Sequence, residues 1–378
     1  MTRLLVSCGE PSGDLYAAEL VRHLRQVRAD LDVFGLGGDR LRDQGAALRA
    51  DVRELAVVGL LEVISHLRRL RRVFRDLLDE VDRRPPAAAV LVDYAEFNLR
   101  LAAALRRRGI PVVYYVSPQV WAWRRGRLRD IRRTVSRMLV IFPFEEPLYR
   151  EAGVPVRFVG HPLVDLVAPA PDRAAFLRQQ GLDPGRPVLA VLPGSRPKEI
   201  AHNLPPIVAA LRRLQGERPR VQFLLAVAPS IEPGSLAPRF EEVPVRMVGG
   251  ATHAVLGACD AAVVASGTAT VEAALLGAPM VVVYRLSPLT YHLGRRLVRV
   301  PHYAMANLIA GRRLVPELIQ SDFTPERVAA EALPLLEDAA VRGRMKEGLA
   351  EVRERLGGPG ASARAADEVR QVLDGFHE

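Results

Sequence analysis

Short apolar runs that end in polar turns recur along the whole chain, and they restrict the fold more than any other feature of the sequence. Each run has the length of one buried strand, and most are followed by an amphipathic stretch with the 3.6-residue period of a helix. Units of strand, turn and helix in series are typical of a parallel sheet with helices on both faces, so we expect an α/β fold. The expected strands span residues 3–7, 31–36, 87–92, 110–116, 138–142, 156–159, 188–192, 222–226, 246–248, 261–265 and 279–284.

A proline-containing stretch interrupts this alternation near the middle of the chain. Pro169-Ala170-Pro171-Asp172 has the composition of a linker, and the strand–helix pattern restarts after it. The 378 residues are enough for two domains of ordinary size. We therefore predict two Rossmann-like domains with doubly wound parallel sheets, residues 1–168 and 169–360, that face a central cleft.

The chain is strongly basic, with a formal net charge of +10. All of its 53 basic residues except Lys198 and Lys346 are arginine. A basic surface favours anionic partners, which include phosphates, nucleic acid and anionic membranes. Nucleic acid is the least favoured of these, because the arginines are spread through amphipathic helices and no recognised binding motif is present.

One predicted helix, between residues 55 and 81, carries a basic face opposite its apolar face. Such a helix lies either on an anionic membrane or on the protein core with its charges in water. The chain has no run of about 20 apolar residues and its N-terminus lacks a signal-peptide pattern, so we expect a cytoplasmic location with peripheral membrane contact at most. The arginines of the basic face are Arg68, Arg69, Arg71, Arg72 and Arg75.

Cysteine and histidine spacing gives no sign of a metal centre or a disulfide framework. The only cysteines are Cys8 and Cys259, and the histidines lack the spacing of metal ligands. We therefore expect neither a metal nor another cofactor.

Acidic side chains follow the predicted strands of the first domain, where α/β folds bind their ligands. Glu10 lies in a glycine-rich turn after the first strand, Asp93 directly follows strand 87–92, and Glu96 comes three residues later. Asp93 is the best candidate for a general base, because a rigid strand end would hold it. His161, in a later turn, is either a structural histidine or a second catalytic candidate.

Both tryptophans, Trp121 and Trp123, follow strand 110–116 and precede a dense run of arginines. Aromatic, apolar and basic side chains within about two helical turns suit a ligand with an apolar part and an anionic part. The alternative is that the aromatic rings pack in the core and the arginines form a solvated helix. Because this stretch follows the strand next to Asp93, we predict that it forms one wall of the cleft.

In the second domain, two loops follow strand ends and begin helices. Gly194-Ser195-Arg196 and Ser266-Gly267-Thr268 offer backbone N–H groups at helix starts, and the first also offers a guanidinium group. Both loops suit a diphosphate. Glu272 lies one helical turn after Thr268 and could accept two ribose hydroxyl groups, although the helix dipole alone also favours an acid there.

Eight segments in order along the chain resemble the lipid A disaccharide synthase family. They are Gly9-Glu10-Pro11-Ser12-Gly13-Asp14, Asp93-Tyr94-Ala95-Glu96-Phe97-Asn98, Tyr115-Val116-Ser117-Pro118 with Val120-Trp121-Ala122-Trp123-Arg124, Phe142-Pro143-Phe144-Glu145, Phe158-Val159-Gly160-His161-Pro162-Leu163, Leu192-Pro193-Gly194-Ser195-Arg196, Ala265-Ser266-Gly267-Thr268-Ala269-Thr270 and Pro316-Glu317-Leu318-Ile319-Gln320. The resemblance covers nearly the whole chain, and eight motifs in order are highly specific.

The resemblance implies a GT-B fold and an inverting glycosyltransferase. Such an enzyme moves a 2,3-diacylglucosamine unit from UDP to the 6-hydroxyl of 2,3-diacylglucosamine 1-phosphate, without a metal, on the inner face of the cell membrane. It also implies that a last helix, about residues 361–375, packs back on the first domain. The oligomeric state is left open.

Site residues follow from the motif match. The resemblance implies Asp93 as the general base, with Glu10 and Glu96 as further catalytic candidates. The implied UDP-sugar residues are Gly194, Ser195, Arg196, Ser266, Gly267, Thr268, Glu272 and Asn307. The implied acceptor or membrane side consists of Ser12, Ser117, Trp121, Trp123, Arg124, Arg127 and His161.

Some positions depart from the family pattern. Pro11 stands where the family has a small residue or threonine, Glu96 replaces an aspartate, and residues 303–307 differ from the usual motif. These departures concern the acyl chains and the acceptor more than the class of reaction. The alternatives are a UDP-N-acetylglucosamine 2-epimerase, a transferase to another glycolipid such as a polyprenyl-linked one, and a non-catalytic UDP-sugar-binding protein.

Overall fold

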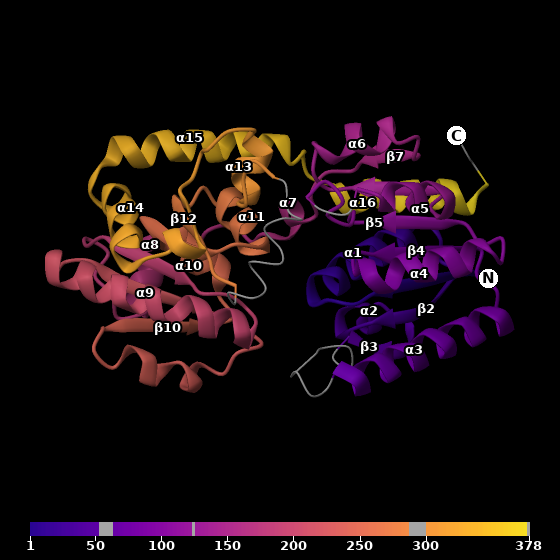
Figure 1. The fold of residues 1–378 in the computed structure, drawn as a ribbon, viewed down its shortest axis with the longest axis horizontal. Helices are drawn as coiled ribbons and strands as arrows, with labels where there is room; N and C mark the ends of the chain where they lie inside the picture. The colour runs from indigo at the N-terminus through magenta and orange to yellow at the C-terminus, as the bar shows by residue number, and fades with distance from the viewer. Residues whose placement is uncertain (53–62, 123–124, 287–299, 376–378) are drawn as a thin grey trace. The chain divides into compact units, whose positions relative to one another are not determined.

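The computed structural model describes residues 1–52, 63–122, 125–286 and 300–375, which form two compact units (Figure 1). Unit 1 runs from Met1 to Pro162 and includes the C-terminal segment from Gly357, and unit 2 runs from Leu163 to Leu356. Each unit contains one parallel sheet with helices, so the predicted α/β fold class with two Rossmann-like domains is confirmed.

The boundaries differ from the predicted 168/169 and 360/361. The first comes earlier because the short helix α7 (Leu163–Leu166) packs against α11 (Thr268–Leu275) in unit 2. The second comes earlier because Gly357 lies against unit 1, where an added Cβ would be 3.2 Å from the Cα of Gly160. The chain therefore passes from unit 1 to unit 2 between Pro162 and Leu163, before the linker-like stretch that begins at Pro169.

The sheet of unit 1 has the strand order β3-β2-β1-β4-β5-β6-β7 in the described part of the chain, with all neighbours parallel. The order reverses between β1 and β4, and ligands of doubly wound sheets bind at this point, beyond the carboxyl ends of the strands. Strand β3 was not predicted, because it is a short edge strand with two charged and two exposed positions. The strands are β1 (Thr2–Cys8), β2 (Leu31–Gly37), β3 (Ala47–Asp51), β4 (Ala88–Val92), β5 (Val112–Tyr115), β6 (Arg137–Val140) and β7 (Val156–Phe158).

Helices cover this sheet, and the last helix of the chain is one of them. Helix α16 packs against α1 (Figure 1). The guanidinium of Arg364 in this helix donates a hydrogen bond to the carbonyl of Val159 at 2.9 Å. Arg28 also forms an ion pair with Asp374. The helices of this unit are α1 (Pro11–Val27), α2 (Asp39–Asp43), α3 (Val63–Arg83), α4 (Ala95–Arg106), α5 (Arg127–Thr134), α6 (Glu145–Glu151) and α16 (Ala361–Leu373).

Helix α3 has the amphipathic pattern that the sequence predicts. Val73, Leu77 and Val81 are buried in the core of unit 1, whereas the five arginines of the basic face are exposed. Residues 53–62, where the predicted helix would begin, lie outside the described residues. No helix in the described residues has both the length and the apolar character that a membrane span requires.

The sheet of unit 2 has the strand order β10-β9-β8-β11-β12-β13 among the described residues, again with parallel neighbours. Strand β13 was not predicted because it has only three residues. The strands are β8 (Val188–Leu192), β9 (Gln222–Val227), β10 (Val245–Gly249), β11 (Ala261–Ala265), β12 (Met280–Tyr284) and β13 (Glu317–Ile319). Besides α7 and α11, its helices include α8 (Arg173–Gln179), α9 (Pro197–Glu217), α10 (Thr252–Ala258), α13 (Met305–Ala310), α14 (Pro325–Glu337), α15 (Ala339–Arg355) and the short 3₁₀ turns η2 (Pro233–Ser235), η3 (Ala237–Phe240) and η4 (Gln320–Asp322).

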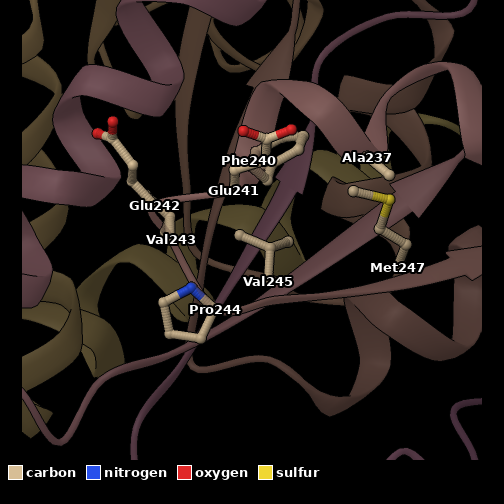
Figure 2. Close-up of a pocket in the computed structure, with 8 residues that line it drawn as sticks. All are labelled: Ala237, Phe240, Glu241, Glu242, Val243, Pro244, Val245 and Met247. Carbon is tan, nitrogen blue, oxygen red and sulfur yellow. The ribbon is translucent and has the colours of Figure 1, made fainter.

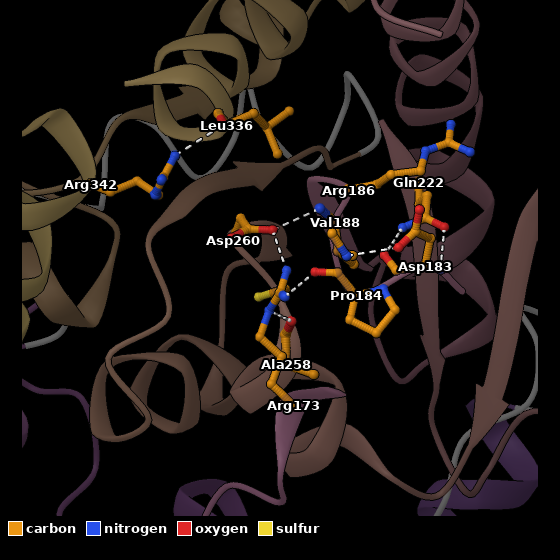
Figure 3. A network of polar contacts seen from close by, with 12 residues as sticks. Arg173, Asp183, Pro184, Arg186, Val188, Gln222, Ala258, Asp260, Leu336 and Arg342 are labelled. Atoms are coloured by element: carbon orange, nitrogen blue, oxygen red, sulfur yellow. Dashed lines mark hydrogen bonds and ion pairs between the residues drawn. The ribbon is translucent and has the colours of Figure 1, made fainter. Parts of the chain in front are cut away.

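A polar network fixes the amino ends of β8 and β11 (Figure 3). Arg173 of α8 donates to the carbonyl of Pro184 at 2.7 Å, to that of Ala258 at 3.0 Å and to the Asp260 carboxylate at 2.8 Å. The same carboxylate oxygen accepts the backbone N–H of Val188 at 2.9 Å. This end of the sheet is therefore held by charge-assisted hydrogen bonds, and the opposite end carries the loops that follow the strands.

Candidate functional site

The backbone after β4 adopts an unusual conformation at the predicted catalytic acid. Asp93 and Tyr94 have φ angles of +48° and +50°, a region that residues other than glycine rarely adopt. Two side chains hold this turn through the carbonyl of Asp93, which accepts the Tyr114 hydroxyl at 2.6 Å and the Asn98 amide at 2.9 Å. The position of Asp93 at the strand end is thus fixed by its neighbours.

Asn98 is fully buried and ties the end of β4 to the end of β1. Its amide nitrogen lies 3.2 Å from the carbonyls of both Ser7 and Val92, and its oxygen accepts the Ser7 hydroxyl at 2.7 Å. The two strands on either side of the point where the strand order reverses are therefore joined by one side chain.

The glycine-rich turn after β1 packs directly against the Asp93 turn. A Cβ atom at Gly9 would lie 2.2 Å from the Tyr94 ring, so only glycine fits there. Burial, and secondly the charge of Glu10, raise the pKa of the Tyr94 hydroxyl, which shows that Glu10 lies near this ring. Glu10 and Asp93 are thus brought to one place, with half-buried Ser12 in the first turn of α1.

Glu96 lies in the first turn of α4, which begins at Ala95. Its carboxylate forms an ion pair with Arg127 and its side chain is 61% exposed. Burial raises the pKa of Tyr114, and Asp93, Glu96 and Arg127 all act on it electrostatically. The Glu96–Arg127 pair therefore stands near the Asp93 turn.

The stretch after β5 forms an aromatic and hydroxyl cluster. Val116 turns the chain with a φ angle of +64°, and buried Ser117 lies 2.7 Å from the hydroxyl of Tyr149. Trp121 packs edge-on against Phe144, with ring centroids 5.2 Å apart. The indole of Trp121 is therefore a packing element, while Trp123 and Arg124 lie outside the described residues.

Glu145 is a buried carboxyl group in this cluster that the sequence did not single out. It accepts the indole N–H of Trp121 at 3.1 Å and the backbone N–H of Phe142 at 3.2 Å. Burial raises its pKa to about 8, although these hydrogen bonds favour the charged form. Its only signal in the sequence is its place in the segment Phe142-Pro143-Phe144-Glu145, which resembles the family.

His161 is buried against the rings of Tyr16 and Phe142, at centroid distances of 6.0 and 5.3 Å. Burial lowers its pKa to about 3, so it is neutral near pH 7. This environment favours a structural role for His161 over a catalytic one.

In unit 2, the loop after β8 carries Gly194, Ser195 and Arg196. Gly194 has a φ of +130°, and an added Cβ would lie 2.5 Å from the carboxylate of Glu199. That carboxylate accepts the backbone N–H of Ser195 at 3.0 Å, and Arg196 is the N-cap of α9. The backbone N–H of Ser195 thus already faces a negative charge, as it would face a phosphate.

A buried asparagine also stabilises this loop. Asn203 of α9 donates to the carbonyl of Pro193 at 3.0 Å and accepts the backbone N–H of Arg285 at 3.1 Å, so it joins the chain after β8 to the chain after β12. Burial, and secondly Glu199, raise the pKa of Tyr284 at the end of β12, whereas the charge of Arg196 opposes this shift. The charge of Arg196, which follows β8, therefore also acts on the carboxyl end of β12.

The second loop, Ser266-Gly267-Thr268, leads into α11, and Glu272 follows one turn later. The Glu272 carboxylate lies 3.2 Å from Nε2 of His253, and Nδ1 of that ring accepts the backbone N–H of Ala168 at 3.2 Å. Because Nδ1 is an acceptor, Nε2 carries the hydrogen and donates a hydrogen bond to the Glu272 carboxylate. His253 has no metal-ligand spacing and stands in no motif, so nothing in the sequence indicates its contact with Glu272.

Asn307 differs from the other predicted UDP-sugar residues. Its amide nitrogen donates to the carbonyl of Val315 at 2.9 Å and to Glu317 at 2.8 Å, and its oxygen accepts the N–H groups of Leu314 and Val315. Glu317 in turn accepts the N–H of Ala304, the N-cap residue of α13, at 2.8 Å. The Asn307 amide is therefore fully used inside unit 2, where it holds Glu317.

A separate hollow of about 470 Å³ lies beside edge strand β10 (Figure 2). Among the described residues that line it, only Glu241 and Glu242 are charged, and both would repel a diphosphate. The lining residues of the hollow are Ala237, Phe240, Glu241, Glu242, Val243, Pro244, Val245 and Met247.

The described residues hold no group of three or more side chains placed to bind a metal ion.

The raised pKa of Glu145 predicts a pH-dependent stability. In the unfolded chain a glutamate loses its proton near pH 4.3, whereas folded Glu145 keeps it up to about pH 8. The folded state thus binds more protons between these values, and the contribution of Glu145 to the free energy of unfolding falls as the pH rises, by at most about 1.4 kcal/mol per pH unit. Glu145→Gln, which cannot titrate, should lack this decline.

Chemical denaturation of the wild type and of Glu145→Gln across this pH range measures the effect. A loss of hydrogen bonds in the variant shifts its free energy of unfolding by the same amount at every pH. The readout is therefore how the difference in free energy of unfolding between the two proteins changes with pH. Glu151→Gln, at the exposed end of the same helix, controls for the removal of a charge. A difference that stays constant from pH 5 to pH 8 would contradict the raised pKa.

Known proteins give an independent view of the whole chain. The family model described as lipid-A-disaccharide synthetase matches residues 4–367. A lipid-A-disaccharide synthase of Myxococcus xanthus is 50% identical over 374 residues, with 98% of this chain and 97% of the relative covered. One from Geobacter sulfurreducens is 45% identical over 373 residues, with the same coverage.

Solved structures share the fold at low sequence identity. The calicheamicin glycosyltransferase CalG4 superposes with a TM-score of 0.62 at 17% identity, over 99% of this chain and 98% of that one. The UDP-GlcNAc 2-epimerase of Neisseria meningitidis bound to UDP-GlcNAc has a TM-score of 0.67 at 13% identity, over 98% of this chain and all of that one. These likenesses confirm the fold alone, whereas the match of the family model and the identity to the relatives show that the chain belongs to the lipid-A-disaccharide synthetase family.

Proposed function

We propose that the chain is a lipid-A-disaccharide synthase. In this reaction a 2,3-diacylglucosamine unit moves from UDP to the 6-hydroxyl of 2,3-diacylglucosamine 1-phosphate, with inversion at the anomeric carbon and release of UDP. Family membership over nearly the whole chain supports the class of reaction. The observation that carries the residue assignment is the turn at Asp93, which two side chains hold in a strained conformation at the end of β4.

In the proposed step, the Asp93 carboxylate takes the proton of the acceptor 6-hydroxyl. The hydroxyl oxygen forms a bond to the anomeric carbon of the donor, and the bond from that carbon to the UDP oxygen breaks with its electron pair. The charge of Glu10 acts on Tyr94, the residue after Asp93, and Glu10 would contact the sugar hydroxyls from the neighbouring turn. Glu96, paired with Arg127, is assigned to positioning and not to proton transfer.

Unit 2 would bind the UDP part of the donor. The diphosphate needs positive charge and N–H donors as the leaving group becomes more negative, and Ser195, Arg196 and the start of α11 offer both. Glu272 would accept ribose hydroxyls, and the His253 imidazole orients its carboxylate. Asn307 acts indirectly, because its amide holds Glu317.

Unit 1 would bind the acceptor. Ser12 lies in the turn that contains Glu10, and the arginines after the tryptophan stretch would meet the acceptor phosphate, among them Arg124 and Arg127. Ser117, Trp121 and His161 would shape the wall of this site from behind, since all three are packed within unit 1. Trp123 is proposed to contribute to the same acceptor site.

Two variants separate the roles of Asp93 and Glu272. Asp93→Asn keeps the shape of the side chain but removes the base, so kcat should fall about 10²- to 10⁴-fold while the Kd for UDP stays the same. Glu272→Gln should instead weaken UDP binding about tenfold and leave kcat nearly unchanged, because a charged hydrogen-bond acceptor is lost. Steady-state kinetics and calorimetric titration with UDP measure both values. Near-normal turnover by Asp93→Asn would remove Asp93 as the base.

We also propose that the chain works at the surface of an anionic membrane, where its lipid substrates lie, and that the basic face of α3 contacts it. Reversing Arg68, Arg69, Arg71 and Arg72 to glutamate should lower binding to anionic vesicles at least tenfold, because each basic residue near such a surface contributes about 1 kcal/mol. Sedimentation with vesicles measures the binding.

The matched control for this experiment reverses the same number of exposed basic residues on unit 2. It uses Arg313, Arg344, Lys346 and Arg353, which gives the same change in net charge. If both quadruple variants lose vesicle binding equally, net charge and not the face of α3 causes the attraction. Unchanged binding of the α3 variant would exclude this helix as the contact.

A further inference from the structure

A long groove in unit 2 lies between α9 and the chain segment that follows β9. Its volume is about 650 Å³, within the range of about 300–1,000 Å³ that is common for ligand sites. We call it the α9 groove and define it by Ile200, Leu204 and Val208 on the helix and by Ile231 and Leu236 on the opposite segment. None of the roles proposed above for the nucleotide or the acceptor uses these residues.

The helix side of the groove is one continuous stripe. Its residues recur every three or four positions from Pro197 to Arg212, the spacing of one helix face. Fifteen residues of helix rise about 22 Å. The fatty chains of one membrane leaflet extend about 15 Å, half the thickness of a hydrocarbon core. The groove is therefore long enough for a single extended acyl chain.

The helix side of the groove is apolar up to Arg212, whereas the opposite segment also carries the charged residues Glu232 and Arg239. Ile200, Leu204 and Val208 of α9 and Leu236 of the opposite segment line the groove, and all four are largely buried. Arg212 stands at the far end of the stripe, where it pairs with Glu242 at 2.9 Å. An apolar ligand that follows the helix would thus meet a charged group at that end, which would limit its length.

The near end of the groove joins the loop that is proposed to bind the diphosphate. Pro197, the first residue of the stripe, directly follows Arg196. The hydroxyl of Ser230, on the opposite segment, donates to the carbonyl of Ser195 at 2.8 Å. A ligand with its diphosphate at this loop and an apolar chain attached to its sugar would therefore enter the groove at this end.

We propose that the α9 groove holds one fatty acyl chain of the UDP-linked donor and measures its length. The proposal rests on the function proposed above, because it requires an acylated sugar nucleotide as the donor. Charge and shape agree with this occupant: the anionic head lies at the Arg196 loop, the chain lies on the apolar stripe, and Arg212 marks the end.

Donors that differ only in acyl length test the proposal. For the wild type, kcat/KM should rise about fourfold for each added methylene group until the groove is full. Ala209 lies on the stripe about one turn before Arg212, and the phenyl group in Ala209→Phe would fill the far end. In this variant the rise should stop at a shorter chain, while short-chain donors and UDP itself behave as with the wild type.

Arg213→Phe is the matched control, since Arg213 is exposed on the same helix and does not line the groove. It should keep the wild-type length profile. A wild-type profile in Ala209→Phe, or a wild type whose kcat/KM does not depend on acyl length, would overturn the groove assignment while the transfer reaction itself stands. A chain that turns over no acylated donor at all would contradict the proposed function instead.

A second measurement needs no variant. A donor analogue with a photoreactive diazirine at the end of its acyl chain is irradiated with the wild-type protein, and the labelled peptides are identified by mass spectrometry. The groove assignment predicts labels within residues 205–212 and 231–239, and an excess of the unlabelled donor should compete them away. Labels confined to unit 1 would overturn it.

Discussion

One buried amide holds the turn on which the proposed chemistry depends. Asp93 and Tyr94 occupy a left-handed backbone region that costs about 1–3 kcal/mol for each such residue. Asn98 makes hydrogen bonds to the ends of both β1 and β4, and each bond returns about 0.5–1.5 kcal/mol. The strain is therefore offset locally, and the Asp93 carboxylate is set by the sheet before any substrate binds, which is what a general base requires.

The same device recurs in unit 2. Asn203 joins the loops after β8 and β12, and Asn307 holds Glu317 against the start of α13. All three asparagines are fully buried, so their polar groups favour one arrangement of the loops over others that would leave them unsatisfied. The loops proposed to bind the donor thus take their shape from side chains beneath them, and Ser195 and Arg196 lie exposed at the surface of unit 2.

The fold was largely predictable from the sequence, because buried parallel strands are continuous apolar runs. Strands β8 and β11 were predicted at their observed bounds, whereas β3 and β13 were missed as short strands with charged residues. The position of Asp93 at a strand end was also predictable. The side chains that hold it were not, because the contact of Tyr114 with Asp93 depends on the register of β4 and β5.

Partners that come from distant parts of the chain were the least predictable features. His253 meets Glu272 only because α10 and α11 pack together, and no spacing in the sequence reports that contact. Likewise, the α9 groove needs the segment after β9, which in the sequence is only a short proline-rich stretch.

The central claim is that this chain joins two acylated glucosamine units. The most direct test incubates the purified protein with UDP-2,3-diacylglucosamine and 2,3-diacylglucosamine 1-phosphate and follows the products by mass spectrometry and NMR. We expect equal amounts of UDP and of a disaccharide 1-phosphate whose new bond joins the 6-hydroxyl with inverted anomeric configuration. Release of UDP without the acceptor, or an epimerised UDP-sugar with no new glycosidic bond, would contradict it.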